Sequence, residues 1–176
     1  MTDTHRLIRS LVENGLIAAL YFVLSAFVPG ISFQMFNFRF GEILVLLCFW
    51  RPDFGLGLSI GCLLANFYGA ATGQTAFIDM LMGTGGTILS VLCVSFLSPR
   101  LLVAVIYPPI FNGLLVGLML YYFYDFASVA LWVEMGWVAL GELTVILLGY
   151  ILWMILKRGS WFFRFLHPTR HLDVKW

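Results

Sequence analysis

Charged and amide side chains interrupt several apolar stretches of this 176-residue chain. An ionisable group near the middle of a bilayer costs at least about 2.5–3.5 kcal/mol, so such groups face the interior of a helix bundle and usually mark a site or a pathway. The sequence therefore predicts a buried polar site with an aromatic ring beside it. Its candidate residues are Arg39, Glu42, Asn66, Asp79, Asn112, Glu134, Trp137 and Glu142.

The charges of these residues indicate what they could bind. Four carboxylates face one cation, Arg39, which lies three residues before Glu42 and could pair with it on one helical face. A bound cation, or a ring edge rich in N–H donors, would satisfy the carboxylates that Arg39 does not pair with. Trp137, with Phe36 and Phe38, could stack on a flat ring. We therefore expect a flat ligand that is either cationic or rich in donors.

A structural interpretation competes with the functional one at several of these positions. A single Asn in a membrane helix more often forms a hydrogen bond between helices than a ligand contact, and this applies to Asn66 and Asn112. Glu134 could be interfacial, and Arg39 could extend its charged end to the headgroups. Three residues favour function, because no Lys or second Arg lies in the spans to pair with them: Glu42, Asp79 and Glu142.

The composition indicates the class of protein. Hydrophobic residues make up 61% of the chain and charged residues 11%, against about 45–50% and about 25% in soluble domains. A transmembrane helix needs about 20 apolar residues, so the length allows about six spans and no appended soluble domain. We predict an all-α integral membrane protein, a six-transmembrane-helix bundle in a single membrane domain at 1–176. The spans are expected at about 7–28, 38–50, 54–68, 76–97, 101–124 and 131–156, with a tail at 157–176.

The distribution of Lys and Arg predicts the orientation of the bundle. Of the 10 basic residues, all except Arg39 fall on one side of the predicted spans, and cytoplasmic loops are enriched in positive charge. Both termini are therefore expected in the cytoplasm of a multi-pass protein of the cell membrane. The polar residues then lie in the outer half of the bilayer, which predicts a pocket open to the outside. Segment 32–37 is expected to dip into the outer leaflet as a lid. Pro108 and Pro109 are expected to kink or break the fifth span part-way.

Other functions are disfavoured by what the sequence lacks. A net charge of +1 gives no sign of a nucleic-acid surface. His5, His167 and His171 lie outside the predicted spans, so neither a metal site nor an intramembrane enzyme is expected. The Gly-rich segment 83–87 has no following Lys, so it is not a phosphate loop and the chain should not hydrolyse ATP by itself. No cofactor is predicted.

Four separated segments carry a resemblance to a known family. The strings FRFGEILVLLCFWRPDFGLGLSIGCLLAN, DMLMGTGGTILS, YPPIFNGLLVG and VALGELTVILLGY resemble, in order and spacing, the QueT-type queuosine-precursor transporters. These proteins are S components, the substrate-binding subunits of energy-coupling factor (ECF) transporters. The resemblance implies a six-helix protein that captures a 7-deazaguanine, such as 7-aminomethyl-7-deazaguanine, from outside for ATP-driven uptake. It also implies partners, namely a transmembrane scaffold subunit and two cytoplasmic ATPases.

The resemblance further implies roles for individual residues. Glu142 or Glu42 would accept hydrogen bonds from the donor edge of the base, and Asp79 would bind its aminomethyl ammonium group. The Ser that the family usually has before the Glu of the second span is Gly41 here. Small residues on the first helix would dock the scaffold, and they are Gly15, Ala18 and Ala19.

Other interpretations stay open at this point. A solitary carrier for the same nucleobase class, coupled to protons through Asp79 or Glu142, would also use intramembrane acids, although no inverted repeat is evident. An S component for another small vitamin-like molecule is a second alternative. A purely structural subunit would not need carboxylates from several helices at one depth.

Overall fold

The computed structural model describes residues 3–26, 38–123 and 130–170, and these ranges are helical without a strand. The helical fold class predicted from the sequence is thus confirmed. In chain order the elements are α1 (Asp3–Ala26), η1 (Phe40–Phe49), η2 (Pro52–Phe54), α2 (Gly55–Ala71), α3 (Ile78–Phe96), α4 (Leu101–Ala104), α5 (Tyr107–Phe123), α6 (Leu131–Leu156) and α7 (Ser160–Leu166).

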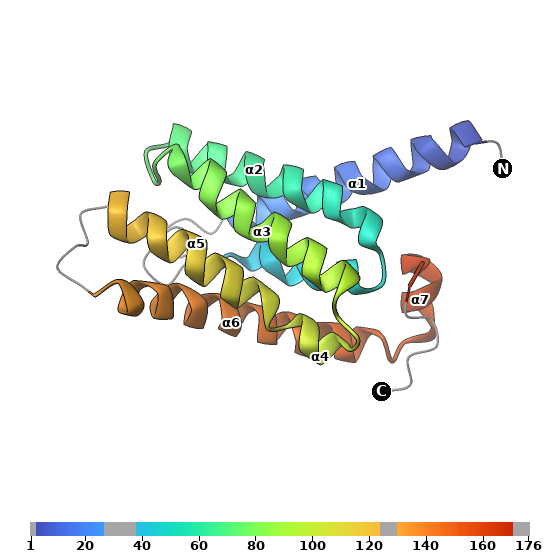
Figure 1. The fold of residues 1–176 in the computed structure, drawn as a ribbon. Helices are drawn as coiled ribbons and strands as arrows, with labels where there is room; N and C mark the ends of the chain where they lie inside the picture. Colours follow the sequence, from blue (N-terminus) through green and yellow to red (C-terminus); the bar gives the residue numbers. More distant parts are fainter. Residues whose placement is uncertain (1–2, 27–37, 124–129, 171–176) are drawn as a thin grey trace.

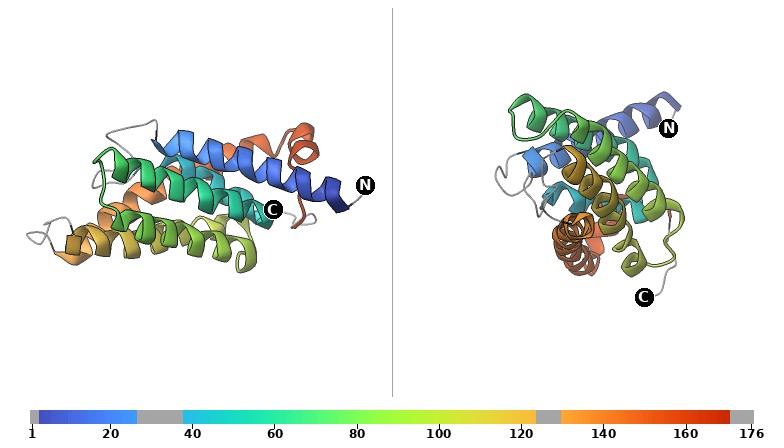
Figure 2. Two further views of the ribbon diagram at one scale, coloured as in Figure 1. Left: turned by 90° about the horizontal axis from the view of Figure 1, so that it is seen from above. Right: turned by 60° about the vertical axis from the view of Figure 1, so that its left-hand side comes forward.

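The long helices form an arc in which each packs against the next. Helix α2 lies between α1 and α3, and α5 lies between α3 and α6 (Figure 1). The first turn of α1 and the short α7 lie at one end of the bundle, and the α2–α3 connection lies at the other, together with the start of α6 (Figures 1 and 2). An even number of membrane crossings would produce this arrangement.

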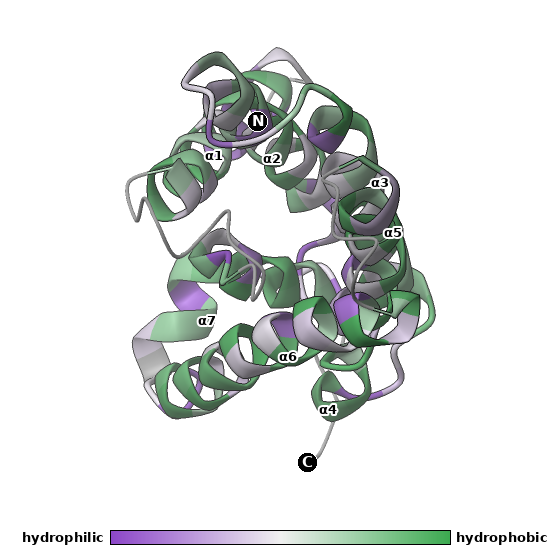
Figure 3. Ribbon diagram, turned by 90° about the vertical axis from the view of Figure 1, so that its left-hand side faces the viewer, coloured by the Kyte–Doolittle hydropathy of each residue, from purple (hydrophilic) through white to green (hydrophobic). Residues whose placement is uncertain are grey.

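The lengths and the surface of the helices suit a bilayer. Five segments of the described chain are long and apolar enough to cross it: Thr4–Ala26, Pro52–Ala71, Ile78–Phe96, Leu101–Phe123 and Leu131–Leu156. Large apolar side chains such as Leu81, Ile110 and Leu140 are exposed on the outside of the bundle, whereas Glu42 and Asn112 are fully buried. Figure 3, viewed along the bundle, shows helices that are mostly hydrophobic with a few hydrophilic segments. A lipid solvent favours this apolar exterior.

The second predicted span is the one that departs most from an ordinary helix. The ten residues of η1 form a 3₁₀-helix, and eight of them are buried between α1, α2, α3 and α6. A 3₁₀-helix rises about 2.0 Å per residue, so ten residues extend about 20 Å, where an α-helix would extend about 15 Å. The tighter winding lets a short segment run through much of the hydrocarbon core, although a sixth crossing stays a prediction.

Other boundaries differ from the predicted ones for identifiable reasons. Helix α1 begins four residues early, and its first turns are supported by a hydrogen bond from Arg9 Nε to Glu13 Oε1 at 2.7 Å. The prediction of a kink or break in the fifth span is confirmed as a break, which separates α4 from α5. Pro108 and Pro109 lie in the first turn of α5, where a missing backbone N–H is tolerated. The predicted lid at 32–37 lies outside the described residues.

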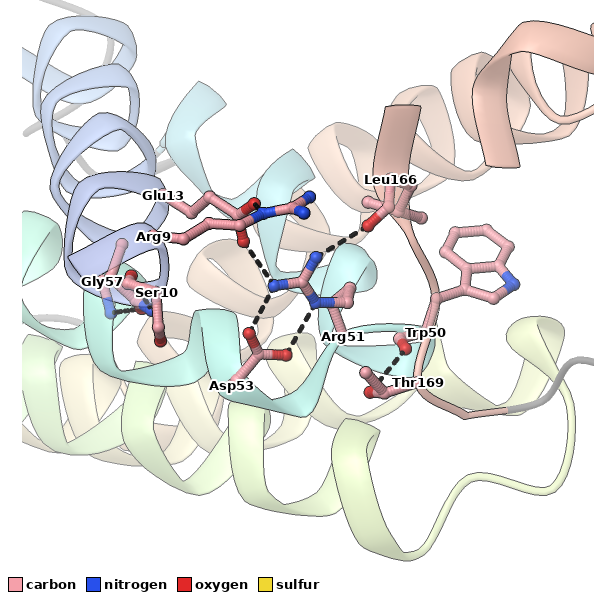
Figure 4. A network of polar contacts seen from close by, with 10 residues as sticks. Arg9, Ser10, Glu13, Trp50, Arg51, Asp53, Gly57, Leu166 and Thr169 are labelled. Atoms are coloured by element: carbon pink, nitrogen blue, oxygen red, sulfur yellow. Dashed lines mark hydrogen bonds and ion pairs between the residues drawn. The ribbon is translucent and has the colours of Figure 1, made fainter. Parts of the chain in front are cut away.

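A hydrogen-bonded network closes the end of the bundle where α1 starts (Figure 4). Arg51, between η1 and η2, donates to Glu13 Oε2 at 2.6 Å, to Asp53 Oδ1 at 2.8 Å and to the Leu166 carbonyl at 2.8 Å. The backbone N–H groups of residues 169 and 170 both donate to the carbonyl oxygen of Trp50. The predicted tail therefore contains a helix, α7, that is joined to the centre of the chain.

Candidate functional site

Polar side chains from six helical elements, together with Arg39, meet inside the bundle. We call this group the polar core. Arg39 precedes η1, and the other members project from α1, η1, α2, α3, α5 and α6. The polar core consists of Tyr21, Arg39, Glu42, Cys62, Asn66, Asp79, Thr84, Thr87, Asn112 and Glu142, all of them buried.

The arginine of the polar core is paired with an acid on another helix. Arg39 Nη2 lies 3.0 Å from Asp79 Oδ2, and both side chains are at most 3% exposed. Gly83 lies one turn after Asp79 on α3, and a Cβ atom there would come within 2.8 Å of Arg39 Nη1. The absence of a side chain at Gly83 thus leaves room for the guanidinium. The pairing of Arg39 with Glu42 that their spacing suggested is replaced by this ion pair between helices.

Glu42 is held by two hydroxyl groups. Its Oε1 atom accepts hydrogen bonds from the Tyr21 hydroxyl at 2.5 Å and from Thr87 Oγ1 at 2.6 Å. The hydroxyl groups come from α1 and α3, on either side of η1. Cys62 Sγ lies 3.3 Å from Thr87 Oγ1 and extends the contact to α2. Sequence reasoning missed Tyr21 and Thr87, because hydroxyl side chains are common in membrane helices and carry no charge that marks them.

The two amides of the polar core use their NH₂ groups inside the protein. Asn66 Nδ2 donates to Thr84 Oγ1 at 3.1 Å, and Asn112 Nδ2 donates to Glu142 Oε1 at 3.2 Å. Asn112 also packs against Gly86, the neighbour of Thr87 on α3. The Asn112–Glu142 pair therefore adjoins the group around Glu42, through Gly86 and Thr87 of α3.

The oxygens that remain in the polar core are unpaired hydrogen-bond acceptors. Each is fully buried and has no hydrogen-bond partner in the described part of the chain. Most buried polar atoms in proteins are satisfied, and a carbonyl or carboxylate oxygen left without a donor costs about 1–3 kcal/mol. The unpaired atoms are Glu42 Oε2, Asn66 Oδ1, Asp79 Oδ1, Asn112 Oδ1 and Glu142 Oε2. The arrangement is complementary to a molecule that presents several donors.

Two predicted site residues lie outside this group. Glu134, in the first turn of α6, is fully buried, and neither of its carboxylate oxygens has a hydrogen-bond partner within the described residues. Trp137 is 37% exposed on α6, so the structure does not place it in the polar core. The stacking partner Phe36 lies outside the described residues. A pocket open to the outside stays a prediction, because the described side chains of the polar core are enclosed.

The small residues proposed to dock a partner are divided between two faces of α1. Gly15 and Ala19 are exposed, and nothing lies within 4 Å of a Cβ atom built on Gly15. Ala18 is buried, and its backbone oxygen would lie 2.7 Å from a Cβ atom on Gly61 of α2. Ala18 thus packs inside the bundle, whereas Gly15 and Ala19 face outward.

The described ranges contain no group of three or more His, Cys, Asp or Glu residues arranged to hold a metal ion. The chemical capacity of the site is therefore that of its hydrogen-bond acceptors and its charges. It can bind a polar molecule away from water and lipid.

Comparisons with known proteins agree with this picture. No match was found among curated proteins or among solved structures. The family model described as "QueT transporter" matches residues 11–158, a range that contains the whole polar core and most of the membrane-capable segments. This chain is accordingly a multi-pass membrane protein that belongs to the QueT transporter family.

Proposed function

We propose that this transporter is the substrate-binding S component of an ECF transporter and that it captures a 7-deazaguanine queuosine precursor in the polar core. The observation that carries the proposal is the set of buried, unpaired acceptor oxygens contributed by η1, α2, α3, α5 and α6. An amide that only joined two helices by a hydrogen bond would not need unpaired acceptor oxygens on four other elements. Their convergence from five elements suits a ligand-binding role better than a structural one.

The donor pattern of a 7-deazaguanine matches these acceptors. One carboxylate can accept the ring N–H and the adjacent exocyclic amine in a two-pronged arrangement. Glu142 and Glu42 each have a free oxygen for this role, and the free amide oxygens of Asn66 and Asn112 can accept further N–H groups. Because the polar core is enclosed, ligand entry in this proposal requires the surrounding helices to separate at one end.

The proposal includes six crossings with both termini in the cytoplasm, and it assigns ATP hydrolysis to partner subunits. The outward face of α1 is suited to the scaffold subunit, because α1 is the least buried of the five membrane-capable segments. Only 17% of its apolar stretch is buried inside the protein. Gly15 and Ala19 on this face would let a second helix approach closely.

Ligand titration of the purified protein tests the proposed function. We expect 7-aminomethyl-7-deazaguanine to bind more tightly than guanine or a panel of vitamins. Glu142→Gln and Glu42→Gln should each weaken binding about 10- to 100-fold, because each removes a charged hydrogen-bond acceptor. Thr144→Ala is the matched control, since Thr144 is exposed on α6 and its hydroxyl donates to the Leu140 carbonyl of the same helix. Undiminished binding by both Gln variants, or no binding of any 7-deazaguanine, would overturn the proposal.

Uptake measurements separate the ECF role from a proton-coupled carrier. In the proposed role, cells take up the base only when scaffold and ATPase subunits are co-expressed, and ATP depletion stops uptake. A solitary carrier coupled through Asp79 or Glu142 would work without those subunits and would stop when an uncoupler collapses the proton gradient.

A further inference from the structure

Glu134 is the buried acid whose role the polar core does not explain. Its side chain has an exposed fraction of 0%, and neither carboxylate oxygen has a hydrogen-bond donor in the described ranges. An isolated, ionised carboxylate in an apolar environment costs several kcal/mol, so a buried acid normally has a partner or is neutralised. The described residues supply no such partner.

Glu134 lies on the same face of α6 as Glu142. The buried residues Glu134, Val138, Gly141 and Glu142 follow the spacing of one helical face. Eight residues separate the two acids, which corresponds to about 12 Å along the helix axis. Val138, one turn after Glu134, belongs to an apolar cluster with residues of α3 and α5. Glu134 therefore lies at the end of the bundle where α3 begins.

The contacts of the neighbouring acids leave Glu134 as the acid with both carboxylate oxygens unpaired within the described residues. Asp79 was the predicted partner of an ammonium group, but its Oδ2 atom is already 3.0 Å from the Arg39 guanidinium. A second cation at Asp79 would be repelled by Arg39. Glu42 accepts two hydroxyl hydrogen bonds and Glu142 one amide hydrogen bond, whereas Glu134 accepts none within the described residues.

We propose that Glu134 binds the cationic arm of the transported molecule and thereby selects an aminomethyl base over neutral analogues. The inference rests on the proposed function, in which the ring of the base lies at Glu142. The ring and the arm would then lie along the buried face of α6, with the ammonium group at the end of the bundle where this helix starts. A carboxylate with two free oxygens can accept two N–H bonds from a primary ammonium group.

The test compares two ligands that differ in charge on the arm. Wild-type protein is expected to bind 7-aminomethyl-7-deazaguanine about 10- to 100-fold more tightly than the neutral 7-cyano base. In Glu134→Gln, which keeps the size of the side chain, affinity for the aminomethyl base should fall to that for the cyano base. Affinity for the cyano base should be unchanged. Glu142→Gln should weaken both ligands, and Thr144→Ala neither.

Each remaining outcome contradicts the inference. If Glu134→Gln keeps the wild-type preference, the ammonium group binds elsewhere. If the variant weakens both ligands equally, Glu134 supports the fold or the ring, and a lowered unfolding temperature would identify the first case. If the wild type binds neither base, the proposed function itself fails. If it binds both equally well, the function stands and the charge selection fails.

Discussion

The acids and amides of the polar core could be located from the sequence because of their type. Glu42, Asp79 and Glu142 are expensive in a bilayer, so their presence in apolar stretches predicted burial inside the bundle, and all are buried. Their partners could not be predicted. Arg39 had an acid three residues away, yet its ion pair is with an acid 40 positions away. Local spacing on one helix says nothing about which side chains a neighbouring helix presents.

The uncharged members of the polar core escaped sequence reasoning for a related reason. A Thr in a helix can donate its hydroxyl to the carbonyl four residues earlier, and the Gly83 carbonyl lies 3.3 Å from Thr87 Oγ1. Such a residue therefore looks ordinary in a membrane span. Only the fold shows that Thr87 Oγ1 lies closer to Glu42 Oε1, at 2.6 Å, and gives its single hydroxyl proton to this carboxylate.

We predict that the buried ion pair between Arg39 and Asp79 makes a large contribution to the stability of the protein. Asp79→Ala should lower the free energy of unfolding by about 3–5 kcal/mol, because it leaves the Arg39 guanidinium buried without its carboxylate. Asn66→Ala is a suitable comparison and should cost only about 1 kcal/mol, because it removes a neutral hydrogen bond. Denaturant titration in detergent measures both. Equal destabilisation of the two variants would show that the ion pair contributes no more to the free energy of unfolding than a neutral hydrogen bond does.

Among the elements, α6 was predicted with the observed bounds, whereas the 3₁₀ winding of η1 was not predicted. Helix α6 is a long apolar run that ends at Lys157, and its extent can be read directly. In η1 eight of the ten residues are buried, so apolar side chains occur all around the helix. A sequence without a polar face has no periodicity to distinguish 3.0 from 3.6 residues per turn. The 3₁₀ winding was therefore invisible in the sequence.

The contact between α1 and α2 should depend on the lack of a side chain at Gly61. A Cβ atom there would lie 2.7 Å from the backbone oxygen of Ala18, which cannot move without the helix. Gly61→Ala should therefore destabilise the protein by about 1–3 kcal/mol.

Gly136 provides the matched control, since a Cβ atom there meets nothing within 4 Å. Gly136→Ala should be neutral or stabilising by up to about 1 kcal/mol, because Ala favours the helix. Thermal unfolding in detergent compares the two variants. A Gly61→Ala protein as stable as Gly136→Ala would mean that the helices can separate slightly without loss.

For the whole molecule, the sequence predicted the side on which basic residues gather, and the fold brings the relevant segments together. Glu13 of α1, the η1–η2 junction and the end of α7 meet in the network around Arg51 (Figure 4). Helix α7 was not predicted, because its aromatic run follows the last span and is too short to cross a membrane. Tertiary contacts with Trp50, rather than local propensity, hold it in place.

The orientation can be tested with single added cysteines. Thr72→Cys, in the connection after α2, should react with a membrane-impermeant thiol reagent in intact cells. Arg158→Cys, after α6, should react only after the membrane is opened, because positively charged segments face the cytoplasm. The wild type gives the background from its own three cysteines, which are buried or half-buried. The reverse labelling pattern would contradict the proposed topology.

The unsatisfied oxygens at the centre of the bundle have a consequence for the transport cycle. Under the proposed function, cargo that supplies the missing donors makes the loaded protein the more heat-resistant of the two states, by an amount that grows with cargo concentration. Loading is then the downhill step, and unloading must leave these oxygens without hydrogen-bond donors again. Discharge of the cargo, rather than its capture, is where energy from the ATPases has to enter.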